Sequence, residues 1–419
     1  MASMPTAPTT EAGPAGRPGR GRGGNGRPDR RADALTRCAG DPARFVAEYF
    51  ARAPLHRPGA DPAAFADLLT LADVDHIVSS TAPRQPAFRM VKDGKPLPPG
   101  SYTRSARIGS RPAPGLADPG RVWDEFAAGA TLVLQGVHRY WPPLTRFCRD
   151  LELALTHPVQ VNVYATPPAS QGLGIHHDPH DVFVLQVHGG KRWDVYGATP
   201  GGVDQPPLIA TGLVPGDCLY IPRSFPHEAR TAESASVHLT IGILGRTWAD
   251  VVRAAVSGVV DELAGQPLPV GWAEDPAGLA AGVTERLAEV GRRVAGLDAA
   301  GLAEREAERF WLSRPPLLEG QLGQVLDLDA VDDDTVVRRR PGAVCRIAVD
   351  GDRLRVVLGD RVLHMPARLE RAVRAVAGED AGDVTVGDLA PHLDGPGRLV
   401  LARRLIREGL LERVAEQLG

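Results

Sequence analysis

The stretch GLGIHHDPHDVFVLQVHGGKRWDVYG, residues 172–197, decides the fold of this chain. It holds two short apolar runs, VFVLQVH and KRWDVYG, on either side of a Gly-Gly pair. Similar runs occur between residues 86 and 245, with Gly, Pro and Asp separating them: FRMV, TLVLQ, VQVNVYAT, CLYIP and VHLTIGIL. Many short strands with turn residues and no regular helices between them are typical of an all-β sandwich or barrel. The sequence therefore predicts a mainly β core of jelly-roll (double-stranded β-helix) type.

Two kinds of sequence precede this β region. Residues 1–38 are mostly Gly, Pro, Arg and Ala, which bury too little apolar surface to offset the entropy of ordering. We predict a disordered tail whose arginines could contact RNA or ribosomal phosphates weakly, although a purely solvated tail is the favoured interpretation. Between 41 and 82, apolar residues recur every three or four positions after Asp or Pro. This spacing predicts amphipathic helices that pack outside the sheet.

A helical pattern follows the β domain, which we place at residues 39–245. Over 246–312, apolar residues recur at helical spacing. The clearest stripe consists of Leu279, Val283, Leu287, Val290, Val294 and Leu297. Such a stripe packs either on the barrel or on a second copy of the chain. We favour the second arrangement, a helical dimerisation region.

Residues 313–419 form a further predicted unit. The segment VCRIAVDGDRLRVVLGDRVLHM contains an Asp-Gly and a Gly-Asp turn, which predicts three short strands. Helical patterns follow at 366–377, 385–393 and 397–409. This order suggests a winged-helix-like domain, in which Arg398, Arg403, Arg404 and Arg407 would line a recognition helix. However, the unit carries 16 Arg against 18 Asp plus Glu, a net charge of −2, so we expect an interaction module rather than a DNA-binding domain.

Composition excludes several functional classes. The formal net charge is −3 and the sequence pI is about 6.5, so no global field attracts nucleic acid or anionic lipid. The four cysteines form no CxxC pair, which argues against a disulfide framework or a zinc knuckle. The chain has neither a run of about 18 apolar residues nor the apolar segment of a signal peptide. We expect a cytoplasmic protein that does not bind membranes.

Histidines are concentrated where chemistry is expected. Four of the twelve lie within thirteen residues, and another follows in PGDCLYIPRSFPHEA, residues 215–229. On a strand, His176 and Asp178 project from one face while His177 points away. His227, about fifty residues on, supplies a third ligand from another strand. Two histidines and a carboxylate form the facial triad of non-haem Fe(II) oxygenases, which leaves positions for a cosubstrate and O2. The same side chains would also suit zinc, and a single histidine here would more often be structural.

A cation and two polar side chains complete the predicted site. A 2-oxoglutarate site needs a cation for the far carboxylate, and Lys191 begins the strand KRWDVYG. The chain has 45 Arg but only three Lys, so a lysine at this position is informative. Asn162, one of two asparagines, lies in the strand VNVYAT, where its amide could donate to a cosubstrate oxygen. Tyr164 shares its face and could help to hold a carboxylate, although structural hydrogen bonding is the alternative for both residues.

These segments together resemble a known family. NVYATPPASQGLGIHHDPHDVFVLQVHGGKRWDVY, GDCLYIPRSFPHEA and HLTI look like the JmjC-type ribosomal oxygenases of the cupin superfamily, closest to the histidyl-hydroxylase branch. The resemblance is dense from about 130 to 245 and looser over 41–419. It implies that His176, Asp178 and His227 bind Fe(II), that Lys191 pairs with 2-oxoglutarate, and that Asn162 and Tyr164 line the pocket. It also implies a helical dimerisation region and a C-terminal winged-helix domain.

The resemblance implies an activity and leaves alternatives open. The expected reaction uses Fe(II), 2-oxoglutarate and O2 to hydroxylate a His or Arg side chain of a ribosomal protein. The alternatives are a tailoring hydroxylase of a peptide natural product or free amino acid, a protein lysine demethylase, and a non-enzymatic metal-binding sensor or adaptor. His177, Pro179 and Gly242 depart from the family pattern, where an aromatic, a polar and a Ser residue are expected. These departures concern the substrate rather than the iron ligands.

Overall fold

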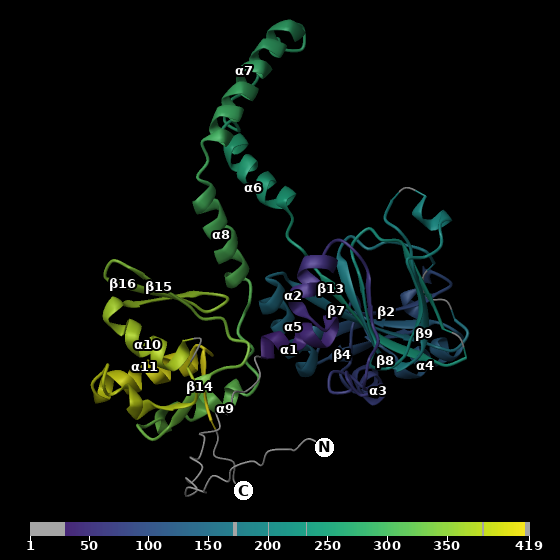
Figure 1. Cartoon of the computed structure of the whole chain (residues 1–419), viewed down its shortest axis with the longest axis horizontal. Helices are drawn as coiled ribbons and strands as arrows, with labels where there is room; N and C mark the ends of the chain where they lie inside the picture. The colour runs from purple at the N-terminus through teal and green to yellow at the C-terminus, as the bar shows by residue number, and fades with distance from the viewer. Residues whose placement is uncertain (1–29, 171–173, 200, 232, 379–380, 415–419) are drawn as a thin grey trace, which may run out of the picture.

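The largest element of the fold is an antiparallel sheet of eight strands, in the order β1-β11-β8-β13-β7-β6-β2-β3. The computed structural model describes residues 30–170, 174–199, 201–231, 233–378 and 381–414 (Figure 1). The strands of this sheet are β1 (Leu55–Arg57), β2 (Phe88–Lys92), β3 (Lys95–Pro96), β6 (Thr131–Leu134), β7 (Val159–Thr166), β8 (Asp181–Gly189), β11 (Cys218–Ile221) and β13 (Ser236–Ile243).

A smaller sheet faces one side of the large one and closes the sandwich. Its order is β10-β9-β12, and its strands are β9 (Lys191–Val195), β10 (Ile209–Leu213) and β12 (His227–Arg230). Val182 and Val184 of β8 pack on this sheet, whereas Phe183 and Leu185 face the helices on the other side. Both faces of β8 are therefore buried, which explains why VFVL is apolar throughout rather than alternating. The predicted mainly β core with flanking helices is confirmed.

Two regular helices interrupt the strands, contrary to the sequence prediction. They are α4 (Pro119–Ala127) and α5 (Pro142–Leu155), and each begins with proline in its first turn. Helix α5 buries an apolar stripe that includes Leu144, Phe147 and Leu151 against the large sheet. A hairpin of β4 (Thr103–Ile108) and β5 (Arg111–Ala117) was not predicted either. It lies in the segment between β3 and α4, where the sequence lacks alternating apolar residues.

The N-terminal segments differ in part from the prediction. Residues 1–29 of the expected tail lie outside the described residues, but 30–38 belong to a helix, α1 (Arg30–Ala39). Its Ala34, Leu35 and Cys38 are buried in the main core, so packing outweighs the polar composition. The predicted helices of 41–82 appear as short elements: α2 (Pro42–Arg44), a π-helical turn over Phe45–Tyr49, and α3 (Leu71–Ser80).

Three helices connect the barrel to the C-terminal unit, as the helical pattern predicts. They are α6 (Trp248–Asp261), α7 (Pro276–Ala295) and α8 (Ala299–Leu312). Figure 1 shows α6 and α7 extending away from both globular parts. The apolar stripe of α7 therefore does not pack on the barrel, and Leu287 is 67% exposed. Trp248, at the start of α6, is 86% exposed.

The C-terminal unit has its own apolar core. The three predicted strands are present as β15 (Arg346–Asp350), β16 (Arg353–Val357) and β17 (Val362–Pro366), paired in that order. A second small sheet and three helices complete it: β14 (Val336–Arg339), β18 (Val384–Thr385), β19 (Leu411–Arg413), α9 (Gln321–Leu326), α10 (Glu370–Ala377) and α11 (Gly395–Arg407). The helix predicted at 385–393 is only a 3-10 turn over Val386–Leu389, which Thr385 and Asp388 cap.

The arginines of α11 are largely engaged within the unit. Arg398 pairs with Asp333, Arg403 donates to the carbonyls of Asp329 and Val331, and Arg404 pairs with Glu408. Arg404 and Arg407 nevertheless remain exposed on α11, and the expectation against DNA binding stays a prediction. All four cysteines are free and buried. No helix among the described residues has the length and apolar character to cross a membrane.

Candidate active site

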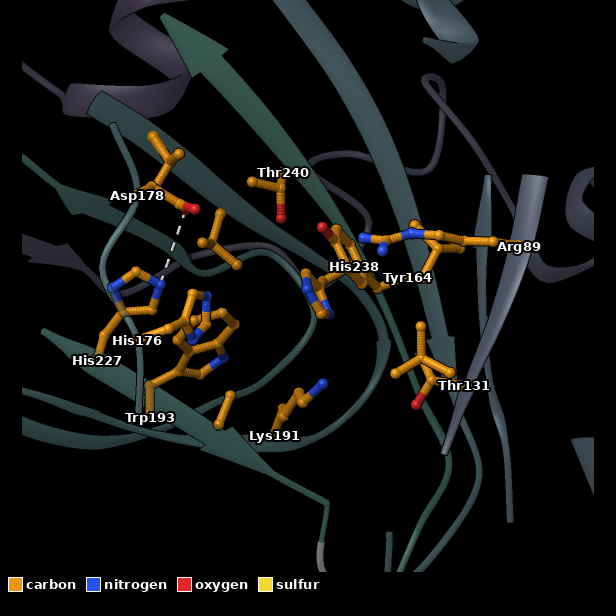
Figure 2. Close-up of a pocket in the computed structure, with 15 residues that line it drawn as sticks. Arg89, Thr131, Tyr164, His176, Asp178, Lys191, Trp193, His227, His238 and Thr240 are labelled. Carbon is orange, nitrogen blue, oxygen red and sulfur yellow. Dashed lines mark ion pairs between the residues drawn. The ribbon is translucent and has the colours of Figure 1, made fainter. Parts of the chain in front are cut away.

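The three predicted metal ligands come together at the open end of the barrel. One ligand atom from each of His176, Asp178 and His227 lies within 4.8 Å of the other two. Nε2 of His227 is 3.8 Å from Oδ2 of Asp178, and the two imidazole rings have centroids 4.4 Å apart. Figure 2 shows the three side chains on one side of the cavity. No other group of three such residues in the described part of the chain has this geometry.

The backbone brings these side chains together without a regular strand at His176. The predicted strand around the HxD segment is absent, and the local structure is an isolated antiparallel bridge between His176 and His227. The two residues exchange backbone hydrogen bonds of 3.1 and 2.8 Å, so their side chains project from one face. The amide of Ser224 donates to the carbonyl of Asp178 and holds the next turn. The side chain of His176 is therefore positioned by its pairing with His227 at the start of β12, and not by the two-residue periodicity of a regular strand.

Hydrogen bonds behind the imidazoles orient them for metal binding. Nδ1 of His176 lies 2.9 Å from the carbonyl oxygen of Gly174, and Nδ1 of His227 lies 3.0 Å from that of Phe225. Since a carbonyl only accepts, each Nδ1 carries the proton and each Nε2 keeps its lone pair. Burial lowers the pKa of His227, which favours the neutral form that binds metals. Two imidazole nitrogens and one carboxylate suit Fe(II) and suit zinc as well.

A cavity of about 150 Å³ extends from the ligands into the barrel. Its walls are apolar, with Val133, Val182, Val184 and Trp193 among the lining residues. Its far end is polar. The polar groups there come from four strands of the large sheet and from β9, and they are Arg89, Thr131, Tyr164, Lys191 and His238.

Lys191 occupies the far end of this cavity, at the start of β9 as predicted. Its amine donates to the hydroxyl of Thr166 at 3.2 Å, and the hydroxyl of Thr131 lies 3.3 Å from the same oxygen. Among the described residues, no carboxylate forms an ion pair with Lys191. Burial lowers its pKa to about 8. A buried amine that lacks an acidic partner is suited to receive an anionic group from a ligand.

Tyr164 and His238 form a stacked pair beside Lys191. Their rings are parallel, with centroids 5.0 Å apart, because the two residues are opposite each other on β7 and β13. Burial, and then the positive charge of Lys191, lower the pKa of His238 well below its usual value, so this imidazole is neutral. Burial raises the pKa of the Tyr164 hydroxyl, which remains a hydrogen-bond donor. The pair forms a rigid wall of the cavity.

Asn162 lies on the same face of β7 as Tyr164, as predicted, but it is not among the residues that line the cavity. Its Oδ1 accepts a hydrogen bond of 3.1 Å from the backbone amide of Gly136. This contact matches the structural alternative for Asn162. Its role toward a cosubstrate stays a prediction.

Four polar residues of the cavity escaped the sequence reasoning: Arg89, Thr131, His238 and Thr240. His238 alternates with Leu239 in β13, so alternation within VHLTI would have placed it on the inner face. Arg89 interrupts the apolar run FRMV in the same way. Because the chain contains 45 arginines, one more arginine in a strand does not by itself indicate a functional site. No sequence pattern indicated that Thr131 would line the cavity.

Known proteins share sequence with this chain over the region that holds the site. The family model for the JmjC domain matches residues 138–251. Ribosomal oxygenase 1 from Gallus gallus is 32% identical over 228 residues, which are 51% of this chain and 36% of that protein. The bifunctional lysine-specific demethylase and histidyl-hydroxylase NO66 from Drosophila pseudoobscura pseudoobscura is 34% identical over 167 residues, 37% of this chain and 18% of that protein. The chain thus spans about a third or less of the length of these relatives.

A solved structure extends the comparison to the whole fold. YcfD, a ribosomal oxygenase from Escherichia coli, in complex with cobalt and 2-oxoglutarate, superposes with a TM-score of 0.51 at 19% identity, covering 90% of this chain and 99% of that one. At this identity the likeness concerns the fold alone. The resemblance to JmjC-type ribosomal oxygenases, inferred from the sequence, is confirmed.

Proposed function

We propose that this chain, whose residues 138–251 match the JmjC domain, is an Fe(II)- and 2-oxoglutarate-dependent oxygenase that hydroxylates a side chain of a ribosomal protein. One observation carries the proposal. Three metal-ligating side chains lie at one end of a single cavity, and a buried amine without an acidic partner among the described residues lies at the other. A keto diacid that chelates a metal with one end and carries a charge at the other fits between them.

Each of the six predicted site residues has a proposed role. His176, Asp178 and His227 hold the iron, and Lys191 pairs with the far carboxylate of 2-oxoglutarate, with Tyr164 and Asn162 assisting. When bound, iron, 2-oxoglutarate and O2 supply the oxidation, in which the keto acid becomes succinate and CO2 and one oxygen atom enters a substrate C–H bond. The barrel fixes ligand geometry, and its apolar walls exclude water from the reacting end. The complex of YcfD with cobalt and 2-oxoglutarate supports this choice of ligands.

The proposed substrate class rests on the names of the relatives and not on the shape of the cavity. Relatives named ribosomal oxygenase support a ribosomal protein, and histidyl-hydroxylase in the name of NO66 supports histidine over arginine. The same name includes lysine-specific demethylase, so demethylation is the second candidate activity. Hydroxylation of a methyl group on nitrogen would begin that reaction in the same cavity.

We also propose the division into a tail at 1–38, a JmjC/cupin catalytic domain at 39–245, a dimerisation region at 246–312 and a winged-helix-like domain at 313–419. Exposed apolar side chains on α6 and α7, including Trp248, Val252 and Leu287, support pairing with a second copy. The free, buried cysteines support a reducing, cytoplasmic location. Sedimentation of the full chain and of Leu287→Asp tests the dimer, since a charge on this stripe should yield monomers.

Turnover of 2-oxoglutarate with a ribosomal peptide tests the activity. We expect peptide-stimulated succinate release that requires Fe(II) and is lost in His176→Ala and Asp178→Ala. His188→Ala is the matched control, because this histidine is exposed at the end of β8. Mass spectrometry of ribosomes from cells with and without the gene then identifies the target as a +16 Da shift. Full turnover by wild-type protein after strict removal of iron would refute the assignment.

A further inference from the structure

We propose that Arg89 is a second cationic anchor for the cosubstrate, gripping the far carboxylate of 2-oxoglutarate beside Lys191 and so setting the preference for a keto diacid over a keto monoacid. The inference rests on the proposed function. It concerns a residue on β2, a strand that carries none of the predicted site residues.

The strand directs Arg89 into the cavity. Its neighbours Phe88 and Met90 are fully buried on the opposite face of β2, in the main core. Arg89 pairs across the sheet with Val133, and both line the cavity. Figure 2 shows the guanidinium of Arg89 beside Tyr164, across the cavity from His176 and His227. The side chain therefore reaches the end of the cavity that is remote from the metal ligands.

Arg89 has no acidic partner among the described residues. Its Nε is buried and makes no hydrogen bond. Arg149, a buried arginine of α5, is a contrast, because it binds Glu152 and the carbonyls of Gly342 and Pro315. Within the part of the chain that the structure describes, Asp178, at the metal end, is the only carboxylate that lines the cavity. A partly buried guanidinium without an acid is costly, and an incoming carboxylate would relieve that cost.

Arg89 and Lys191 offer different kinds of contact to one carboxylate. The guanidinium is a planar fork that can donate two parallel hydrogen bonds, whereas an ammonium is a point charge. The guanidinium of Arg89 lies beside Tyr164, and its positive charge opposes the rise that burial causes in the pKa of the Tyr164 hydroxyl.

The experiment measures binding rather than turnover. Calorimetry on the Mn(II)-loaded full chain compares 2-oxoglutarate with 2-oxopentanoate, which has the same carbon chain but a methyl group in place of the far carboxylate. We expect Arg89→Met to weaken 2-oxoglutarate binding about 10- to 100-fold, the usual range for losing hydrogen bonds to a charged group. The weak binding of 2-oxopentanoate should change by less than about threefold, and Arg89→Lys should give an intermediate loss for 2-oxoglutarate.

Arg192→Met is the matched control. Arg192 follows Lys191 on β9, is exposed and pairs with Asp194, so this variant removes one positive charge close by without touching the cavity. Its affinity for 2-oxoglutarate should equal that of the wild type. If Arg89→Met does not fold, as judged by its melting curve, Arg89→Lys and Arg89→Gln give the comparison.

The other outcomes are distinguishable. An equal loss for both ligands would mean that Arg89 only positions Tyr164 and would overturn the inference. Unchanged 2-oxoglutarate binding with weakened peptide binding would assign Arg89 to the substrate and would overturn it too. If metal-loaded wild-type protein binds no 2-oxoglutarate, the proposed function itself fails, whatever Arg89 does.

Discussion

The two ends of the cavity are built in different ways. At the metal end, His176 and Asp178 lie on irregular backbone that is tied to β12 by an isolated bridge and a few hydrogen bonds. At the far end, Thr131, Tyr164 and His238 project from regular strands whose opposite faces are buried in the core, and Lys191 begins the regular strand β9. The far end is therefore a preformed part of the fold. The metal end depends on local contacts, and a bound ion would add cross-links that the chain lacks by itself.

The largest expected effect comes from removing a metal ligand. His227→Ala should lower turnover by more than about 100-fold and should abolish the metal-dependent rise in melting temperature, because the ion loses one of three ligands. Metal titration followed by melting curves checks both. The melting temperature without metal should barely change, since the far end and the core remain. A large loss of stability without metal would contradict the contrast between the two ends.

Removing the cation at the other end should separate cosubstrate binding from metal binding. Lys191→Met should weaken 2-oxoglutarate binding about 100-fold and leave metal affinity unchanged, because the far carboxylate loses a buried charged partner. Calorimetry with each ligand in turn measures the two affinities. Equal losses of metal and 2-oxoglutarate affinity would show that the ends are not independent.

Alkaline pH should act on the far end alone. Burial lowers the pKa of Lys191 to about 8, and a bound carboxylate stabilises the charged amine and raises its pKa again. Binding therefore takes up a proton above pH 8, and affinity falls as pH rises. Between pH 7.5 and 9 we expect a loss of up to about tenfold, set by linkage. Binding isotherms at several pH values check this, and Lys191→Met should be nearly insensitive over the same range.

The smallest expected effect concerns the support behind Lys191. Thr131→Val removes the hydroxyl that contacts Thr166. The Thr166 hydroxyl in turn accepts a hydrogen bond from the amine of Lys191. A loss of about 1 kcal/mol in the free energy of unfolding is expected for one buried hydrogen bond. Denaturant melts measure it, and 2-oxoglutarate affinity should fall only about two- to fivefold. A loss comparable with that of Lys191→Met would mean that Thr131 itself binds the ligand.

The strands of the main sheet were predictable from the sequence, whereas several elements between and before them were not. Runs such as VFVLQVH and VHLTIGIL predicted β8 and β13, because strands buried on one or both faces need apolar side chains at fixed intervals. Helices α4 and α5 were not predicted, because α4 buries only Val122 and so carries a weak apolar stripe, and α5 begins at prolines, which also mark turns. Helix α1 was missed because three buried side chains suffice to order it against the core, whatever its composition.

By itself the sequence determined the chemistry that is available: the spacing of His176 and Asp178, the later His227, and a rare lysine at residue 191. Residue type and separation along the chain fix which donors exist and which class of metal they suit. Only the tertiary structure decided that Asn162 binds Gly136, that His238 stacks on Tyr164, and that Arg89 enters the same cavity as Lys191. These contacts join strands that are far apart in sequence, and the packing of both sheet faces, rather than any local pattern, sets which side chains meet.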